Sequence, residues 1–140
     1  MAIGQTQTTV FKLNLLKALE NFNVGTPYTY KIALYTAAAN LSYETLAYTT
    51  DGEISGTGYT AGGRTLTPIV PATSGQVAYI SFQNVTWNPA SFTARGALIY
   101  NSTTGAAVAV LDFGADKTAT NTFTVTFPTA NATNAIIRLT

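Results

Sequence analysis

The sequence contains no cysteine and no histidine. Without cysteine, neither disulfide bonds nor thiolate metal sites can form, and the redox state of the compartment is left open. Without histidine, the chain lacks the usual base that activates a nucleophilic serine, a common zinc ligand and the side chain that titrates near neutral pH. These two absences exclude the most common kinds of nucleophilic and zinc-dependent active site.

Charged side chains are scarce. Seven basic and six acidic residues give a net charge of +1 and make up 9% of the chain, where about 25% is typical of soluble domains. Binding to nucleic acid needs a concentrated basic surface, so we expect no nucleic-acid partner. A nearly neutral surface also provides little repulsion between free monomers. We therefore expect other protein subunits, including copies of this chain, to cover much of the outer surface.

Long apolar runs are absent as well. No run approaches the length that crosses a bilayer, and the N-terminus lacks the basic region and apolar core of a secretion signal. We expect no membrane association, and synthesis in a cytoplasm.

Threonine and tyrosine are abundant. The chain has 26 threonines and eight tyrosines, and β-branched and aromatic residues favour strands. A length of 140 residues fits one domain, residues 1–140, that can bury a core without covalent cross-links. The composition thus predicts a single β-domain with a neutral, hydroxyl-rich exterior.

The N-terminal region predicts one helix, over residues 9–22, after a flexible arm at residues 1–8. Thr8 or Thr9 can cap its start, and Gly25 follows its end. We expect its apolar face to pack on a sheet, and docking on a partner is the alternative. The apolar residues on that face are Phe11, Leu15, Ala18, Leu19 and Phe22.

From residue 28 onward, short β-type runs are separated by clusters of Gly, Pro, Asn, Ser and Asp. In one run Phe123, Val125 and Phe127 alternate with threonines, so one face is aromatic and the other hydroxylic. The predicted fold class is all-β, an antiparallel two-sheet β-sandwich, jelly-roll-like, with one N-terminal α-helix. The nine predicted strands are residues 28–36, 52–55, 64–70, 75–82, 85–87, 91–101, 106–113, 121–127 and 134–140.

Residues 55–66 form a glycine-rich stretch with the sequence SGTGYTAGGRTL. A phosphate-binding loop would continue with Lys and then Ser or Thr into a helix. Here Gly62 and Gly63 are followed by Arg64 and a β-branched run, so the stretch is interpreted as a structural loop in which glycines supply positive φ. The loop leaves open whether Tyr59 is a packing anchor or a contact to a neighbouring molecule.

Six carboxylates are the remaining candidates for chemistry. A glycosidase needs two of them facing each other about 5 to 10 Å apart across a sugar. The spacing of Asp51 and Glu53, and of Asp112 and Asp116, places a glycine inside each pair, which favours solvated turns over an acid pair or a calcium site. We expect no catalytic residue, no metal site and no cofactor. The six are Glu20, Glu44, Asp51, Glu53, Asp112 and Asp116.

Aromatic residues allow a different function. Trp87 could form a platform for sugar stacking on a β-sandwich, together with exposed tyrosines such as Tyr43, Tyr48 or Tyr59. A core position for Trp87 is the alternative. A carbohydrate-binding module is therefore a second hypothesis.

Several stretches together resemble a known class of proteins. They are YKIALYT, SGTGYTAGG, ARGALIYN and FTVTFPTANATNAIIRL, and the likeness runs from about Phe11 to Leu139. They resemble small virion structural proteins of tailed bacteriophages. The resemblance implies a non-enzymatic virion component, a capsid decoration or cement protein on the major capsid protein of the outer shell. A small tail or fibre-attachment protein is the alternative.

The resemblance carries no catalytic residues with it. It implies location in the virion, and closed symmetry at threefold positions of a shell would suit a homotrimer. As candidates for turns or interfaces we select Tyr59, Arg64, Trp87 and Arg95.

Overall fold

The computed structural model describes residues 3–23, residue 25 and residues 27–140 of the chain. Within these residues the structure has one helix and ten strands, and all the paired strands run antiparallel. The elements are β1 (Thr6–Gln7), α1 (Thr9–Leu16), β2 (Tyr30–Tyr35), β3 (Arg64–Thr65), β4 (Ala72–Ser74), β5 (Val77–Ile80), β6 (Val85–Trp87), β7 (Phe92–Asn101), β8 (Ala107–Ala119), β9 (Phe123–Val125) and β10 (Ile137–Leu139).

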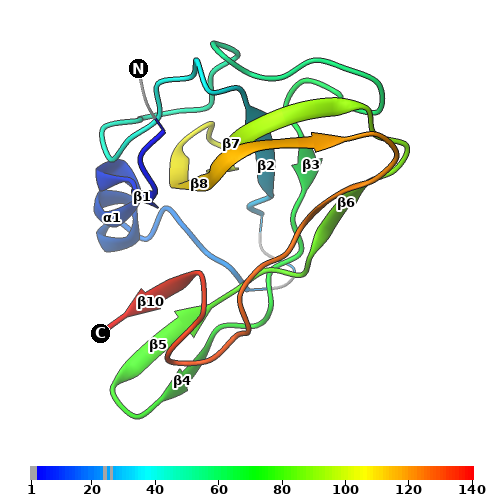
Figure 1. Cartoon of the computed structure of the whole chain (residues 1–140). Coiled ribbons are helices and arrows are strands. Elements are labelled where there is room, and N and C mark those ends of the chain that lie inside the picture. The colour runs from blue at the N-terminus through cyan, green and yellow to red at the C-terminus, as the bar shows by residue number, and fades with distance from the viewer. Residues whose placement is uncertain (1–2, 24, 26) are drawn as a thin grey trace.

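The strands form one large sheet and two small ones (Figure 1). The large sheet has the order β1-β8-β7-β2-β3, and the small sheets have the orders β10-β5-β4 and β6-β9. The predicted all-β, antiparallel, sandwich-like fold with one helix is confirmed. Two small sheets replace the second continuous sheet of the prediction.

Strands β6 and β9 continue the hairpin formed by β7 and β8. β6 leads into β7, and β8 leads into β9, so residues 85–125 make one long hairpin. The pairing persists through the bend, where the Ala90 N–H donates to the Asn121 carbonyl at 2.7 Å. The hairpin folds back on itself, and its β6–β9 end lies over the face of the large sheet.

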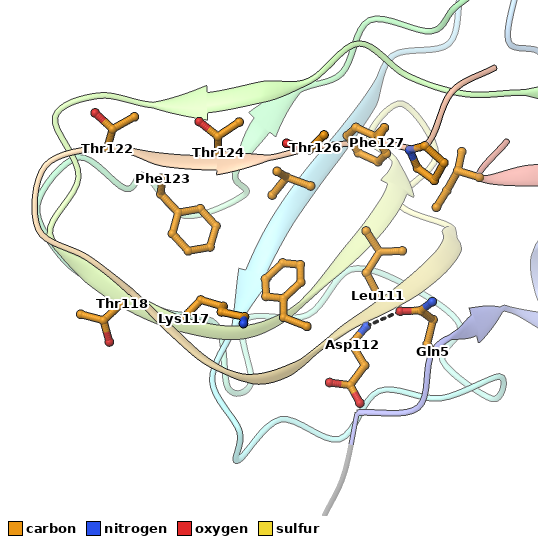
Figure 2. Close-up of a pocket in the computed structure, with 14 residues that line it drawn as sticks. Gln5, Leu111, Asp112, Lys117, Thr118, Thr122, Phe123, Thr124, Thr126 and Phe127 are labelled. Carbon is orange, nitrogen blue, oxygen red and sulfur yellow. Dashed lines mark hydrogen bonds between the residues drawn. The ribbon is translucent and has the colours of Figure 1, made fainter. Parts of the chain in front are cut away.

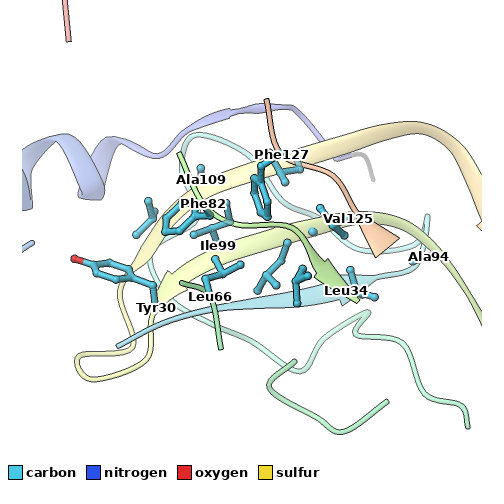
Figure 3. Close-up of a cluster of buried hydrophobic side chains, with 14 of the residues drawn as sticks. Tyr30, Leu34, Leu66, Phe82, Ala94, Ile99, Ala109, Val125 and Phe127 are labelled. Carbon is cyan, nitrogen blue, oxygen red and sulfur yellow. The ribbon is translucent and has the colours of Figure 1, made fainter. Parts of the chain in front are cut away.

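The larger core cluster lies between these two layers. Alternate residues of β2, such as Ile32 and Leu34, point into it. Figure 3 shows Phe82, Val125 and Phe127 facing the side of the large sheet that carries Leu34 and Ile99. Large aromatic rings fill this space because they bury the most apolar surface per residue.

The other face of the large sheet has a second, smaller core cluster. Ala33 and Tyr35 of β2 point into it, as does Leu98 of β7. The cover on this side is the long connection between β2 and β3, residues 36–63, which contributes Leu41. Since β2 is buried on both faces, its sequence is almost continuously apolar.

The prediction of a flexible arm at residues 1–8 is wrong from residue 3 onward; residues 1–2 lie outside the described residues. Strand β1 pairs with β8, and Gly4 donates to the Leu41 carbonyl at 2.8 Å. The side chain of Ile3 lies on Gly96. A β-carbon added to Gly96 would be 2.8 Å from Cδ1 of Ile3. Pairing with the exposed edge of β8 and packing of Ile3 in the space above Gly96 hold residues 3–7 in place.

Helix α1 is shorter than the predicted range of 9–22. Its start is as expected, because Thr8 Oγ1 accepts a hydrogen bond from the Phe11 N–H at 3.2 Å. It ends at Leu16, since Ala18 adopts a left-handed φ of 59° and Leu19 N–H donates to Asn14. The packing of the residues that follow α1 against β2 explains why the helix ends early.

The residues after the helix pack against the start of β2. The ring of Phe22 stacks on Tyr30, with 4.5 Å between the centroids. The side chain of Glu20 is buried there and hydrogen-bonded to Tyr30. A helix continued to residue 22 would not place these groups on β2, so tertiary packing overrides the local helix propensity.

The glycine-rich stretch at residues 55–66 is a structural loop, as predicted. It lies directly on the backbone of other strands, because a β-carbon on Gly63 would collide with the Ile32 carbonyl oxygen, and one on Gly58 with that of Pro89. Both glycines have positive φ, 78° and 87°. Two separate requirements, conformation and close approach, select glycine here.

Substituting Gly63 with alanine tests this close approach. Gly63→Ala should lower the free energy of unfolding by about 2–5 kcal/mol, since it combines a left-handed strain of about 1–2 kcal/mol with overpacking of about 1–3 kcal/mol. Urea denaturation measures the loss. Gly75→Ala is the matched control, because Gly75 also has positive φ but has open space around it. Equal losses in the two variants would contradict the packing argument.

Candidate interaction surfaces

Tyr59 is a packing anchor. Its hydroxyl accepts a hydrogen bond from the Leu34 N–H at 3.0 Å and donates to Glu53 Oε2 at 2.5 Å. Its ring lies against Trp87 and Phe92, with centroid distances of 6.2 and 5.9 Å. The residue joins the glycine-rich loop to β2 and to the larger core, so the structure answers the question that the sequence left open.

Glu53 is the centre of a hydrogen-bonded tyrosine cluster. Besides Tyr59, its carboxylate accepts from the Tyr48 hydroxyl at 2.5 Å and from the Gly62 N–H at 2.8 Å. The Tyr100 ring stacks on Tyr48 at 4.8 Å, and its hydroxyl donates to the Gly62 carbonyl at 2.6 Å. Burial, followed by the bonds to Glu53, raises the pKa of Tyr48 and Tyr59. These tyrosines therefore act as neutral donors that support the loop.

The carboxylates of the two candidate pairs have separate surroundings, and only the turn at Asp112 is as expected. Glu53 is held by the tyrosines, whereas Asp51 is exposed. Asp112 accepts from the Gly114 N–H at 2.8 Å and from Arg95 Nε at 3.3 Å, and these bonds, the first above all, lower its pKa. Among the described residues, no group of three or more acidic side chains is placed to hold a metal ion.

Trp87 lies in the core and has only 1% of its surface exposed. Its ring contacts Tyr59, Phe92 and Phe123, and its indole N–H has no hydrogen-bond partner among the described residues. The prediction that Trp87 could stack on a sugar or contact a partner is therefore wrong. Its ring packs in the larger core cluster between the two layers, which explains its burial.

The two arginines selected from the sequence lie apart from this core. Arg64 is exposed on the outer strand β3, and Arg95 lies on β7, with β2 between the two strands. Arg95 faces a bulge of β8, where the register shifts between Ala94 and Gly96. The four candidates of the sequence thus do not form one surface.

A groove of about 510 Å³ opens between β8 and β9, where the two strands do not pair (Figure 2). Phe123 and Phe127 line its apolar side, and Lys117 and Asp112 lie at its other wall. The Asp112 N–H is capped by Gln5 Oε1 at 3.0 Å. A bulge, charged residues and a side-chain cap are the devices that protect exposed strand edges, so the groove is interpreted as a protected opening of the sandwich.

Helix α1 and strand β10 form the second candidate surface. Helix α1 has apolar residues all round, but only Phe11 is buried. Leu13 and Leu16 point outward, and Leu16 has 87% of its surface exposed. On β10, Leu139 is 52% exposed. We call this surface the α1–β10 face and define it by Lys12, Leu13, Leu16, Lys17, Leu19, Arg138 and Leu139.

Two hollows lie side by side on the α1–β10 face. An apolar notch of about 110 Å³ lies between the helix and β5 and β10, and its lining includes Leu15, Tyr79 and Leu139. A wider, open hollow is lined by Lys12 and Arg138. Leu139 lines both, so the apolar hollow and the basic hollow adjoin at this residue, and we call the two together the depression. Figure 1 shows α1 and β10 on the same side of the molecule.

The surface leucines gave a weak signal in the sequence. Leu13 and Leu16 lie outside the predicted apolar face of the helix, next to Lys12 and Lys17. A helix that is apolar on more than one side normally contacts more than one neighbour. Candidates chosen for being aromatic or cationic missed these aliphatic residues.

The role of Tyr59 can be tested by removing its hydroxyl. Tyr59→Phe should lower the free energy of unfolding by about 1–3 kcal/mol, because the Leu34 N–H and Glu53 each lose a partner in a mostly buried place. Thermal and urea denaturation measure the change. Tyr43→Phe is the control, since 58% of Tyr43 is exposed. An unchanged stability of the Tyr59 variant would refute the anchor role.

Glu20 predicts a pH dependence. Its carboxylate is buried and accepts from Asn101 at 2.8 Å and from Tyr30 at 3.2 Å; burial outweighs these bonds and raises its pKa above 4.5. The folded state thus keeps the proton to a higher pH than the unfolded state, and stability should fall as the pH rises from 4.5 through the folded pKa.

Denaturation at several pH values, with Glu20→Gln beside the unchanged chain, measures this effect. The glutamine variant should lose the decline and be the more stable form at pH 7, since no buried charge has to form. Glu44→Gln, at an exposed position, is the control. Parallel pH profiles for the Glu20 variant and the unchanged chain would contradict the assignment.

In the described part of the chain, no helix is long and apolar enough to span a bilayer. Comparisons with protein families, with curated proteins and with solved structures find no match to the chain. A proposal for its function therefore rests on the surfaces described above and on the resemblance seen in the sequence.

Proposed function

We propose that this chain is a non-enzymatic structural protein of a bacteriophage virion, a capsid decoration or cement protein that binds the major capsid protein on the outer shell. The observation that carries the proposal is the α1–β10 face, on which Leu13, Leu16 and Leu139 have 47%, 87% and 52% of their surface exposed to solvent. A group of exposed large apolar residues marks a surface for protein contacts.

Burial of these leucines supplies the energy for such a contact. Each fully buried leucine contributes about 1.5–3 kcal/mol, so two or three of them provide a modest affinity for one copy. A shell presents its sites in a fixed array, and copies that also touch one another gain from multivalency. The low charge of the chain favours this use, since the cores of protein interfaces are depleted of charged residues.

The carboxylates support a structural role. Glu53 and Asp112 are engaged by hydrogen bonds within the chain and stabilise a loop and a turn, and Glu20 is buried in the segment that follows α1. A reaction would need a carboxylate presented to substrate, so these contacts favour a non-enzymatic function.

A place on the tail or at a fibre attachment would use the same surface. Imaging of the virion with a gold-labelled antibody against this chain discriminates between shell and tail. Three copies around a threefold position of the shell are the arrangement that we propose, and light scattering of the free chain and of its shell complex measures the stoichiometry.

The shell contact can be tested with one lysine on the face and one elsewhere. Leu16→Lys should weaken co-sedimentation with shells assembled without this chain by about tenfold or more, because it removes one buried leucine. Thr86→Lys adds the same charge on the exposed side of β6 and should bind like the unchanged chain. Both positions are exposed, so both variants should fold.

The result that would overturn the proposal is simple to recognise. If the unchanged chain neither sediments with the shells nor decorates the virion, it is not a decoration protein. If it binds but both variants bind equally well, the shell contact lies on another surface than the α1–β10 face.

A further inference from the structure

The depression on the α1–β10 face combines two kinds of surface within reach of one short peptide segment. Its apolar half is closed by side chains of α1, β5 and β10 and has a volume of about 110 Å³. That volume suits one large apolar side chain. Leu139 forms the border to the other half, which is open and contains Lys12 and Arg138.

The basic half is lined by Thr6, Gln7, Leu139 and Thr140 besides its two cations, so among its described residues no acidic side chain compensates Lys12 and Arg138. Among the described residues that line the two hollows, none has an acidic side chain. Lys12 has no ion pair or hydrogen bond from its side chain in the described part of the chain. Arg138 makes a single long bond, 3.4 Å from Nη1 to the Ala132 carbonyl. Lys17 adds a third exposed cation beside Leu16.

We propose that the depression binds a protruding segment of a partner protein in which one large apolar side chain is flanked by carboxylates. The apolar side chain enters the notch beside Leu139, and the carboxylates lie against Lys12 and Arg138. The inference rests on the proposed function, since the virion partner would provide this segment. It adds the chemistry of the partner: an acidic, apolar projection.

A second copy of the chain does not fit the depression as well. In a twofold contact the same patch lies on both subunits, so Lys12, Lys17 and Arg138 of one copy would face those of the other. Like charges that meet across an interface are unfavourable. The charge pattern therefore favours a different, acidic surface over self-association through this face.

An anionic membrane is the other surface that basic and apolar residues can bind. Insertion into a bilayer needs a continuous convex apolar face, usually along a long helix. Here α1 has eight residues and the apolar part of the site is a notch between elements. A concave site receives a projection, which a protein segment supplies and a bilayer does not.

Synthetic peptides test the recognition without the virion. The probe is the capped peptide Asp-Glu-Phe-Asp-Glu, and the comparison probe is Lys-Lys-Phe-Lys-Lys; amide NMR shifts of the full chain give the affinity and the site. The acidic peptide should shift α1 and β10 signals and bind at least about fivefold more tightly than the basic one, the ratio expected for two exposed ion pairs.

Two double variants of equal net charge separate the effect of the site from the effect of overall charge. Lys12→Gln with Arg138→Gln should weaken binding of the acidic peptide about fivefold. Thr60→Glu with Thr86→Glu changes the net charge equally at exposed positions of a loop and of β6 and should leave binding as it is. The acidic peptide should also lose affinity as NaCl rises.

Equal binding of both peptides, shifts outside α1, β5 and β10, or equal losses in the two double variants would overturn the proposal. Tighter binding to vesicles of anionic phospholipid than to the peptide would overturn it too, in favour of a membrane. The shell experiment is independent of the peptide experiment. If shells bind the variant with Lys12→Gln and Arg138→Gln as well as they bind the unchanged chain, the chain is still a decoration protein, but its partner is not acidic.

Discussion

Burial of both faces of the central sheet is the constraint that shapes the molecule. Strands β2 and β7 lie in the middle of the large sheet, and their side chains alternate between two core clusters. Such a sheet needs a cover on each side. One cover is the returning end of the long hairpin, β6 and β9. The other is the connection at residues 36–63, which has few regular elements, so its polar groups need bonds from side chains. The cluster around Glu53 provides them.

Nearly all the large aromatic residues pack in or against the two core clusters, and this leaves aliphatic residues for the outside. Phe11 of the helix is buried, while Leu13 and Leu16 of the same helix remain in solvent. A helix of eight residues cannot bury leucines on two opposite sides by packing on one sheet. In the proposed function the excess apolar surface of α1 contacts another molecule, and the neighbouring cations of α1 and β10 favour a partner with negative charge.

The sequence predicted the elements whose signals are local. Strands β6 and β7 lie within a residue or two of their predicted bounds, and Thr8 caps the helix as expected. Strand β1 was missed, because the pair Thr6 and Gln7 is polar and becomes a strand only by pairing with the edge of β8. The helix end was missed because residues 17–22 favour a helix locally, whereas the contacts of Glu20 and Phe22 need the chain to turn.

The interaction surface could be predicted only in part. The scarcity of charge indicated protein contacts, but the residues chosen for them were two aromatic residues and two arginines. Trp87 proved to be a core residue and Tyr59 a partly buried residue packed against the core, since large rings fill the space between the two layers. Lys12 and Arg138 lie far apart in the sequence, and only the placement of α1 and β10 in the fold brings both to one hollow.

The bent hairpin at residues 85–125 has a consequence for how the molecule reaches its native state. Both layers around the aromatic core belong to this one contiguous segment. Because the two layers are close in sequence, the entropic cost of closing the loop between them is small. Strand β2 can then pair with β7 of the formed hairpin. Folding of a topology with many contacts between distant residues thus begins with contacts between residues close in sequence.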